Sequence, residues 1–206
     1  MTTEGLIKVV GGTGSPYTQK IVALLRYRRI PYAIIWGQPK QICEELDVTV
    51  PKPILMPTVF FQEGGALLAQ SDSTPIIRRL ESIHRKRSVL PSDPALAFLD
   101  YLIEDFADEW CTKYMFHYRW YSAADADNAG TLLPLGMDVS IPQSQLLERK
   151  EFIEERQIER LWVVGSNDIT APIIDASYCR FLEAMEAHLA AQHFMLGYRP
   201  GAGDFG

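Results

Sequence analysis

Apolar residues near the N-terminus change from a continuous run to helical spacing. The run from Leu6 to Val10 is rich in β-branched residues and ends at a glycine-rich segment, whereas the apolar positions between Ile21 and Leu25 suit the buried face of a helix. Ser15 and Pro16 stand just before that helix, where a serine can cap it and a proline is tolerated in the first turn. This stretch therefore predicts a strand, a loop and a helix with a hydroxyl group at its N-terminus.

Three more apolar runs continue the pattern as short strands. The run over residues 32–36 follows the helix and makes a parallel βαβ unit with the opening strand. The next two lead from Ile54 to Phe61, with a proline at the strand entry, and from Ala66 to Ala69, and Gly64-Gly65 between them is a signal for an antiparallel hairpin. A short helix is expected over residues 41–46, within a connection that prolines otherwise break up.

Small polar residues then mark a second helix N-terminus. Ser71 to Thr74 precede Pro75, a dense capping signal, and apolar residues at helical spacing follow. The charged, proline-rich stretch over residues 83–94 is interpreted as a linker that ends in a capping aspartate. Beyond it only helices are expected, over residues 95–121, 143–162 and 171–192, with a loop over residues 122–142.

The order of these elements predicts two domains. Residues 1–87 form an α/β domain with the order βαβ-ββα, and residues 88–206 form an all-α domain. A chain of 206 residues is long enough to bury a proper core in each. The order alone is a weak pointer to function, because one fold hosts many activities.

The composition is that of an ordinary globular protein and excludes some partners. With 22% charged residues, a net charge of −6 and a pI near 5.3, no basic face for nucleic acid is expected. The basic clusters, which include Arg28 and Arg87, are interpreted as solvated helix ends. No apolar run approaches the roughly 20 residues that span a bilayer, and no leader pattern opens the chain, so a cytoplasmic location without membrane contact is expected.

Metal, disulfide and histidine chemistry is not indicated by the sequence. The cysteines, Cys43, Cys111 and Cys179, are widely spaced and form no CxxC pair, so they are expected to be reduced, buried thiols. A group of acidic residues within 95–121 is interpreted as a solvated helix face rather than a metal site: Glu104, Asp105, Asp108 and Glu109. His84 and His117 are interpreted as isolated, and the spacing of His188 and His193 does not suit a shared ligand, so none of the four is expected to be catalytic.

Three motifs, in order and at suitable separations, resemble signatures of the glutathione transferase superfamily. They are Ser15-Pro16-Tyr17-Thr18 with Lys20, the strand entry Met56-Pro57-Thr58, and Asp72-Ser73-Thr74-Pro75 with the helix after it. The resemblance covers essentially the whole chain and is strongest over residues 6–81. It implies a thioredoxin-like N-terminal domain, a helical C-terminal domain and glutathione as the ligand, with no metal.

The resemblance also implies a role for each matching residue. Ser15 stands where serine-type members place the hydroxyl that stabilises the glutathione thiolate, and Tyr17 is the alternative hydroxyl. Met56-Pro57 matches the position of a cis-proline whose preceding residue pairs through its backbone with the cysteinyl part of glutathione. Asp72 and Ser73 match the residues that hold the γ-glutamyl group, whose carboxylate is received at a helix N-terminus.

The activity that follows is transfer of glutathione to a small electrophile, in a homodimer. A free thiol has a pKa of about 8.5 and the thiolate is the nucleophile, so the serine is expected to donate a hydrogen bond to sulfur and not to attack. Aromatic residues on one helical stripe form either domain or dimer packing or the wall of the co-substrate pocket: Trp110, Tyr114, Tyr118 and Tyr121.

Other functions stay open at this point. The rival hypothesis is a non-enzymatic protein that keeps the scaffold for binding or assembly, and a variant of the leading one is glutathione-dependent isomerase or dehalogenase chemistry. An oxidoreductase is disfavoured, because Ser15 stands where redox relatives carry cysteine. Residues 197–206 resemble the loop and cap before a core helix of the family's second domain, so the helical domain is expected to be incomplete at its C-terminus.

Overall fold

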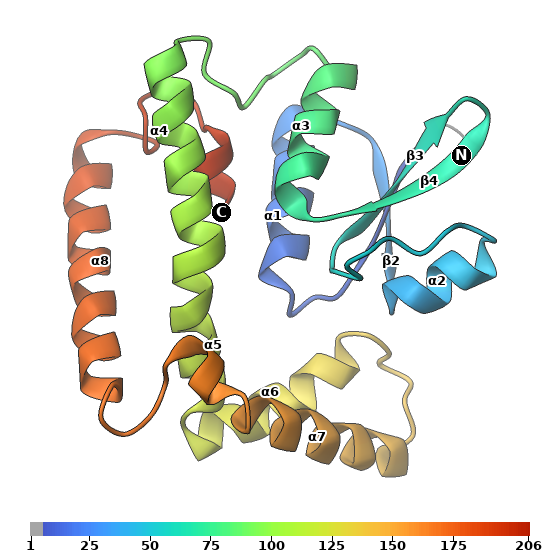
Figure 1. Cartoon of the computed structure of the whole chain (residues 1–206), viewed down its shortest axis with the longest axis vertical. Coiled ribbons are helices and arrows are strands. Elements are labelled where there is room, and N and C mark those ends of the chain that lie inside the picture. The colour runs from blue at the N-terminus through green and yellow to red at the C-terminus, as the bar shows by residue number, and fades with distance from the viewer. Residues whose placement is uncertain (1–5) are drawn as a thin grey trace. The chain divides into compact units, whose positions relative to one another are not determined.

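The computed structural model describes residues 6–206, which divide into two compact units (Figure 1). Residues up to Leu90, together with residues 136–139, make the first unit, and residues 91–135 and 140–204 make the second. The expected domain boundary after residue 87 stays a prediction. Among residues 6–206, no helix combines the length and the apolarity needed to cross a membrane.

The first unit is a four-stranded mixed sheet with helices on both faces. Its elements, in chain order, are β1 (Ile7–Gly11), α1 (Pro16–Arg28), β2 (Tyr32–Trp36), α2 (Pro39–Glu45), β3 (Thr58–Glu63), β4 (Ala66–Ser71) and α3 (Ser73–Ile83). The strand order is β2-β1-β3-β4, with β1 and β2 parallel and the other pairs antiparallel. The predicted βαβ-ββα arrangement, the short helix and the thioredoxin-like class are confirmed.

The hairpin between β3 and β4 turns on two glycines, as predicted. Gly64 and Gly65 have φ values of 59° and 83°, the left-handed region that residues with a Cβ rarely adopt. Two consecutive positive φ values match the twist of antiparallel strands, which fixes the register from Glu63 opposite Ala66 back to Thr58 opposite Ser71. The end of β4 is thereby held beside the start of β3.

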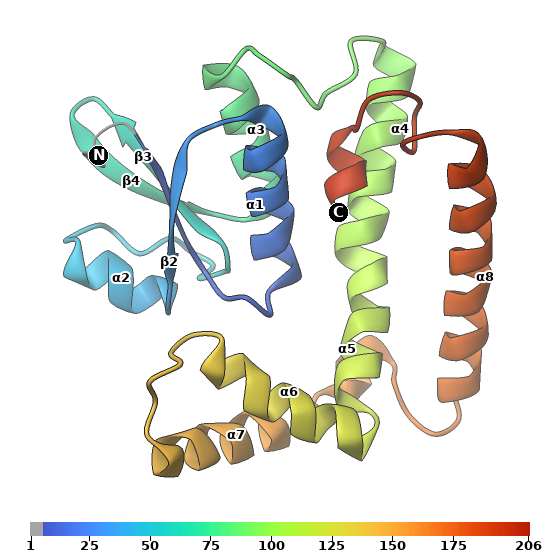
Figure 2. The same ribbon diagram turned by 180° about the vertical axis from the view of Figure 1, so that it is seen from behind.

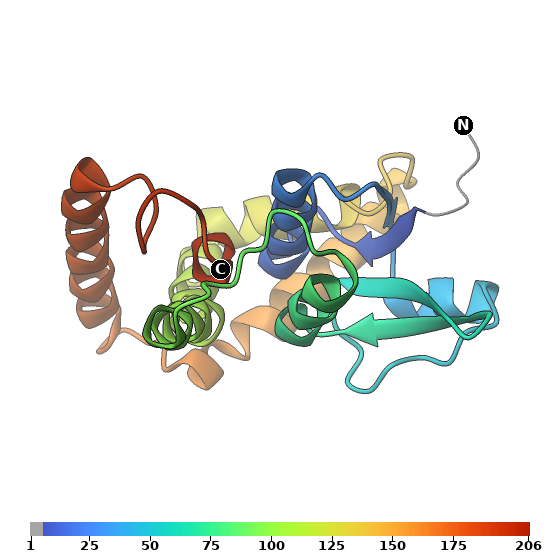
Figure 3. The same cartoon turned by 90° about the horizontal axis from the view of Figure 1, so that it is seen from above.

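Helices cover the sheet of the first unit on both faces. α1 and α3 lie side by side on one face in all views (Figure 1, Figure 2 and Figure 3), and α2 lies on the other. The first face has fully buried aliphatic side chains on both helices: Ile21, Leu24, Leu25, Ile76, Ile77 and Leu80. On the second face Val10 and Phe60 pack with Cys43 of α2. Each such side chain contributes about 1.5–3 kcal/mol on burial, so the two layers hold the sheet firmly.

One basic residue is not at a solvated helix end. The Arg28 side chain is fully buried, with its guanidinium 3.0 Å from the Glu81 carboxylate and donating to the backbone oxygens of His84 and Lys86. Burial lowers the pKa of Arg28 and the Glu81 charge opposes that effect. The expectation of solvated clusters is wrong for Arg28, which joins the end of α1 to the end of α3.

The second unit is helical throughout. Its elements are α4 (Pro94–Asp105), a π-helical segment (Phe106–Cys111), α5 (Thr112–Trp120), α6 (Ala123–Leu135), α7 (Gln143–Ile158), a 3-10 turn (Leu161–Val164), α8 (Ala171–Ala191) and a 3-10 turn (Ala202–Phe205). The helix expected over residues 95–121 is thus interrupted by a π-helical segment. The helices expected over residues 143–162 and 171–192 are confirmed, and the last residues of the former lie in the 3-10 turn that follows α7.

The loop expected over residues 122–142 is wrong, because α6 occupies most of it. Two small residues on one face of α6, Ala126 and Ala129, pack against the buried ring of Trp120. Gly130 lies so close to α7 that an added Cβ would clash with the Glu154 side chain. Small residues let the helix approach its neighbours, and this burial outweighs the weak helix propensity of the segment's aspartates, asparagine and glycine.

The acidic face expected on the helix over residues 95–121 is also buried in part. Glu104 is 1% exposed and Asp108 is 9% exposed. Asp100, 2% exposed, accepts hydrogen bonds from the backbone N–H groups of Ala202 and Gly203 at 3.1 and 3.0 Å. A carboxylate that receives backbone donors is tolerated in an interior.

The cysteines are free thiols, as expected, but they are not all buried. Cys43 is buried and Cys111 is half-buried, whereas Cys179 on α8 is exposed. Burial raises the pKa of the Cys43 and Cys111 thiols. The expectation of buried thiols is therefore wrong for Cys179.

Candidate functional site

The loop after β1 places Ser15 at the N-terminus of α1. Its backbone is extended (φ −87°, ψ 116°), and its Oγ accepts a hydrogen bond from the Thr18 N–H at 3.2 Å. The Ser15 N–H donates to the Gly12 carbonyl at 3.1 Å, which closes the turn. The predicted cap is confirmed. Since the oxygen serves as the acceptor, the O–H group keeps its donor capacity at the positive end of the helix.

A second helix N-terminus is capped by Asp72. Its Oδ1 accepts from the Thr74 N–H at 3.2 Å, so the predicted capping signal is confirmed. The Asp72 backbone has φ 76° and ψ 123°, outside the regions that residues with a Cβ normally occupy. Such strained residues cluster at ligand sites, where the surrounding structure holds them in place. The exposed carboxylate and its strained backbone therefore mark the start of α3 as a candidate site.

The segment before β3 enters the strand through a cis peptide bond between Met56 and Pro57. The Thr58 hydroxyl donates to the Leu55 carbonyl at 2.9 Å and ties this entry together. A Cβ added at Gly12 would lie 3.5 Å from the Met56 Sδ, so Met56 reaches the loop after β1. The cis form at Pro57 is what the family resemblance implied.

Strand register brings these three segments to one edge of the sheet. Val10, near the end of β1, pairs with Thr58, the first residue of β3, and Thr58 also pairs with Ser71, the last residue of β4. Ser15 follows β1, Pro57 precedes β3 and Asp72 follows β4. Residues far apart in the sequence therefore converge beyond the same three strand ends.

Lys20 adds a buried cation that the sequence did not single out as a site residue. It lies on α1, is 3% exposed, and its ammonium donates to the Ser73 hydroxyl at 3.2 Å. Ser73, the first residue of α3, is 4% exposed. In the sequence, Lys20 stood out only as the last residue of the first family motif. The contact joins α1 to the N-terminus of α3, where a positive charge adds to the helix dipole.

This edge suits a ligand that carries both a carboxylate and an ammonium group. The α3 N-terminus and Lys20 favour an anion, and the Asp72 carboxylate accepts from a cation. Among residues 6–206, no group of three or more histidine, cysteine, aspartate and glutamate side chains is arranged to hold a metal ion. The roles of Ser15, Tyr17 and the Met56 backbone toward a ligand stay predictions.

The aromatic stripe on the second unit directs its polar atoms toward neighbouring side chains. The Trp110 Nε1–H donates to the Tyr114 hydroxyl at 3.0 Å, and that hydroxyl lies 2.7 Å from the Ser177 hydroxyl of α8. The Tyr118 hydroxyl donates to the Asp175 carboxylate at 2.7 Å. Burial and this hydrogen bond raise the pKa of Tyr118. These contacts fix the rings against α8, and their role in a co-substrate pocket stays a prediction.

His117 is not isolated, contrary to the sequence interpretation. It is 3% exposed, its Nδ1 lies 2.7 Å from the Ser166 hydroxyl, and its ring stacks on Tyr121 at 4.7 Å. Burial lowers the pKa of His117, and the Asp175 carboxylate, 4.0 Å from Nε2, opposes that effect. A neutral imidazole, bonded to Ser166, is the form that this packing favours.

Comparison with known proteins identifies the first unit. Residues 14–83 match the family model of the glutathione S-transferase N-terminal domain. No curated protein matches the sequence. Many solved structures match the fold, and the chain spans about three quarters of the length of those described next.

Three of these structures illustrate the likeness, and each covers 97% of this chain and 74% of its own. FzlA from C. crescentus is 15% identical with a TM-score of 0.59. A glutathione S-transferase from Rhodospirillum rubrum F11 is 15% identical with a TM-score of 0.58. A glutathione S-transferase from Methylobacterium radiotolerans, in complex with glutathione sulfonate, is 17% identical with a TM-score of 0.50. At these identities the likeness shows a shared fold.

Proposed function

We propose that this chain is a member of the glutathione S-transferase superfamily that binds glutathione and transfers it to a small electrophile, because residues 14–83 match the N-terminal domain of that family. The observation that carries the proposal is the convergence of Ser15, Pro57 and Asp72 beyond three strand ends of one sheet. The glutathione sulfonate bound by the Methylobacterium radiotolerans relative supports the choice of ligand. A homodimer in the cytoplasm is part of the same proposal.

The γ-glutamyl end of glutathione is assigned to the start of α3. Its carboxylate accepts from the Ser73 hydroxyl at the N-terminus of α3, while the Lys20 ammonium lies behind that hydroxyl. Its ammonium donates to the Asp72 carboxylate. The exposed face of that carboxylate and the buried ammonium at Lys20 supply charges of the required sign.

The cysteinyl part is assigned to the Met56 backbone, which leaves the sulfur near the N-terminus of α1. There the Ser15 O–H donates a hydrogen bond to the thiolate and the helix dipole favours the negative charge. Lowering a thiol pKa of about 8.5 by about two units takes roughly 2.7 kcal/mol, which a charge-assisted hydrogen bond and a helix N-terminus together supply. The thiolate then attacks the electrophile.

The chemical step needs no further co-reactant. With an aryl chloride, the thiolate forms a carbon–sulfur bond at the ring carbon, and the carbon–chlorine bond breaks with its electron pair on chloride. The thiol proton leaves to solvent when the thiolate forms. The chain's contribution is to bind the tripeptide, hold the sulfur near Ser15 and stabilise its charge.

Retention on immobilised glutathione and turnover of 1-chloro-2,4-dinitrobenzene test the proposal. The protein is expected to bind the matrix, to elute with free glutathione, and to form the conjugate. The Asp72→Ala variant should lose retention, whereas Asp47→Ala, which removes another aspartate with positive φ on the first unit, should keep it. Binding without turnover on any electrophile favours the non-enzymatic hypothesis, and no binding contradicts both.

A further inference from the structure

Charge is divided unequally between the two parts of the chain. Residues 1–90 contain twelve lysines and arginines against seven aspartates and glutamates, whereas residues 91–206 contain eight against nineteen. The net charge of −6 therefore comes entirely from the second part, and the first part is cationic. Charges of one sign that gather on one part of a molecule attract partners of the opposite sign. The cations of the first part are therefore candidates for an interaction surface.

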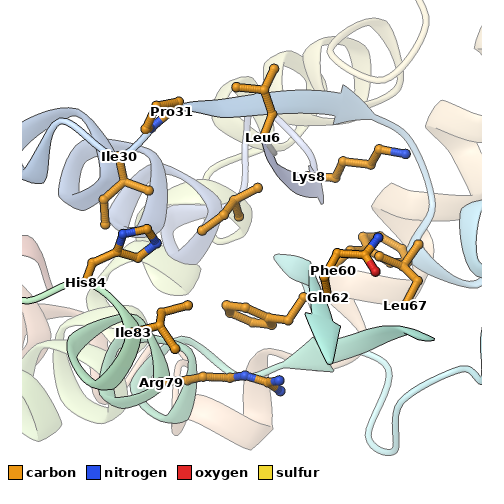
Figure 4. A pocket seen from close by; sticks show the side chains of 12 residues that line it. Leu6, Lys8, Ile30, Pro31, Phe60, Gln62, Leu67, Arg79, Ile83 and His84 are labelled. Atoms are coloured by element: carbon orange, nitrogen blue, oxygen red, sulfur yellow. The ribbon is translucent and has the colours of Figure 1, made fainter. Parts of the chain in front are cut away.

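Two basic stretches of the sequence meet where α1 and α3 end. The buried Arg28 guanidinium at the end of α1 donates to the backbone oxygen of His84, which follows α3. In the opposite direction, the Arg87 Nε donates to the Tyr27 backbone oxygen, and the Arg87 guanidinium lies over the Tyr27 ring at 4.4 Å. Figure 4 shows Ile30 and His84, one from each stretch, next to one another. The fold therefore joins basic residues that are more than 50 positions apart in the sequence.

Five cations on these two stretches are exposed to solvent, and we call them the basic patch: Arg26, Arg29, Arg85, Lys86 and Arg87. Neither stretch, over residues 26–32 and 82–90, contains an aspartate or a glutamate. The adjoining acidic residue is Glu81, which is already engaged by the Arg28 guanidinium at 3.0 Å and by the Val89 N–H at 3.0 Å. The positive charge of the basic patch is therefore not balanced by the segments that carry it.

Local contacts hold several of these cations in place. Arg29 is the C-cap of α1, in the left-handed conformation (φ 56°), and its N–H donates to the Arg26 carbonyl at 3.1 Å. The Arg26 Nε donates to the Tyr32 hydroxyl at 2.9 Å, and Arg87 is held by Tyr27 as described above. A guanidinium has five N–H donors, so one such bond leaves others for a partner. Side chains that are already ordered lose less entropy on binding.

The charges of the chain favour a short acidic segment over larger anions. Four of the five cations are arginines, whose planar guanidinium binds a carboxylate through two parallel hydrogen bonds. A nucleic-acid duplex or an anionic membrane is far larger than the basic patch and meets the net repulsion of the whole chain, whereas a short peptide meets the patch alone. A second copy of the chain is a weaker match, because the helix with most carboxylates, α7, interleaves four glutamates with three cations.

We propose that the basic patch at the ends of α1 and α3 binds a short acidic segment of a partner protein, whose aspartate and glutamate carboxylates accept hydrogen bonds from the arginines. Ser15 and Asp72 cap the opposite ends of the same two helices. The 13 residues of α1, at about 1.5 Å each, separate its two ends by about 20 Å. The acidic segment and glutathione therefore bind at separate places on the first unit, and the interaction does not depend on the proposed transferase activity.

Fluorescence anisotropy of the full chain with a labelled octapeptide of alternating aspartate and glutamate tests the basic patch. The double variant Arg29→Gly, Arg85→Gln is expected to weaken binding by about tenfold, since it removes two of the five cations. Glycine adopts the positive φ of residue 29 without strain, so the end of α1 is kept. The matched control is Lys40→Gln, Arg149→Gln, which removes the same charge from exposed positions of α2 and α7 and should keep wild-type affinity.

Several outcomes would overturn the proposal. One is the absence of peptide binding by the wild type at low salt, and another is an equal loss of affinity in the patch variant and its control. Tighter binding of a DNA duplex or of phosphatidylserine vesicles than of the peptide would assign the patch to a different partner. Self-association of the wild type that the patch variant abolishes, measured by analytical ultracentrifugation, would assign it to a second copy of the chain.

Glutathione retention is measured in parallel on the same proteins. The patch variant is expected to be retained like the wild type, because neither Arg29 nor Arg85 lies at the helix N-termini proposed to hold glutathione. Peptide binding without glutathione retention in the wild type would contradict the proposed transferase and leave the acidic-segment site standing. Retention without peptide binding would do the reverse, so the two proposals fail separately.

Discussion

At the scale of single residues, Ser15 caps helix α1 and also carries the hydroxyl that is proposed to stabilise the thiolate. Its Oγ accepts from the Thr18 N–H at 3.2 Å, a cap that contributes about 1 kcal/mol to stability. The same geometry leaves the O–H as a donor at the positive end of α1. A substitution at Ser15 therefore has two effects, and a test of its role must separate stability from turnover.

Ser15→Ala is expected to lower turnover of 1-chloro-2,4-dinitrobenzene by about tenfold or more, because the thiolate loses a charge-assisted hydrogen bond. The dissociation constant for glutathione should change by less than about threefold, since the γ-glutamyl contacts remain. The pH profile of kcat/KM should shift to higher pH, as the bound thiol becomes a weaker acid.

Ser82→Ala is the matched control for that prediction. The Ser82 hydroxyl is exposed on α3 and donates to the Arg79 carbonyl of the same helix at 2.7 Å. Its removal should therefore leave turnover unchanged. Tyr17→Phe tests the other hydroxyl. Full activity in Ser15→Ala together with a loss in Tyr17→Phe would assign the working hydroxyl to Tyr17 and contradict the role of Ser15.

His117 predicts a pH dependence of stability. Its pKa is lowered in the folded state, chiefly by burial, so the unfolded chain binds a proton first as the pH falls. Stability is fully present above the usual histidine pKa of about 6.5 and is lost as the pH falls through the lower folded value, by at most about 1.4 kcal/mol per pH unit.

Thermal unfolding between pH 7.5 and pH 5 measures this effect. We expect the melting temperature of His117→Gln to fall less steeply than that of the wild type, while His193→Gln, which changes an exposed histidine, should follow the wild type. His84, whose pKa is also lowered, keeps some pH dependence in both. Parallel curves for His117→Gln and the wild type would show that His117 does not titrate on unfolding.

At the scale of elements, the sequence predicted α1, α3 and α4, each of which begins with a side-chain cap, but it did not predict α6. The hydroxyl of Ser15 and the carboxylates of Asp72 and Asp93 accept backbone N–H groups at the starts of α1, α3 and α4. α6 has Pro134 in its last turn. Its stability comes from packing against α5 and α7, which local sequence does not reveal.

Asp93→Ala is expected to destabilise the protein by about 1 kcal/mol, because Oδ1 accepts from the N–H groups of Ala95 and Leu96, each at 2.9 Å. Asp93→Asn keeps an acceptor oxygen and should lose little. Urea unfolding followed by circular dichroism measures both. Equal losses in the two variants would mean that the negative charge, and not the cap, is the stabilising feature.

At the scale of the whole molecule, this chain shares its fold with proteins whose sequences are very different from its own. Identities of 15% to FzlA and to the Rhodospirillum rubrum transferase accompany coverage of 97% of this chain. The buried pattern of strands and helices is what such distant chains share, since many apolar side chains of suitable volume fill the same core. Function does not follow at that distance and has to be tested on the molecule itself.

Binding of glutathione should raise the melting temperature of the protein, because a ligand that binds only the folded state stabilises it by mass action. At 100 times the dissociation constant the gain is about 2.7 kcal/mol, or about 5–10 °C for a chain of this size. Asp72→Ala should abolish the shift, whereas Lys8→Gln should leave it intact. Differential scanning calorimetry measures all three, and a shift retained in Asp72→Ala would contradict the assigned γ-glutamyl site.

Most of the first unit could be predicted from local patterns in the sequence. The strand and helix order, the caps at Ser15 and Asp72 and the Gly64-Gly65 hairpin all depend on residues within a few positions of one another, so local pattern was sufficient. The motifs around them, compared with a known family, also led to glutathione. The roles proposed for the motif residues in binding glutathione depend on the chemistry of their side chains, which the sequence alone specifies.

The long-range contacts and the burial of individual side chains became known only from the folded molecule. Strand pairing joined Val10, Thr58 and Ser71 across more than 60 residues of chain. Packing buried the Lys20 ammonium beside Ser73, buried Arg28 between two helix ends, and formed α6 where a loop was expected. Burial and long-range pairing depend on the whole fold, and no local pattern in the sequence records them.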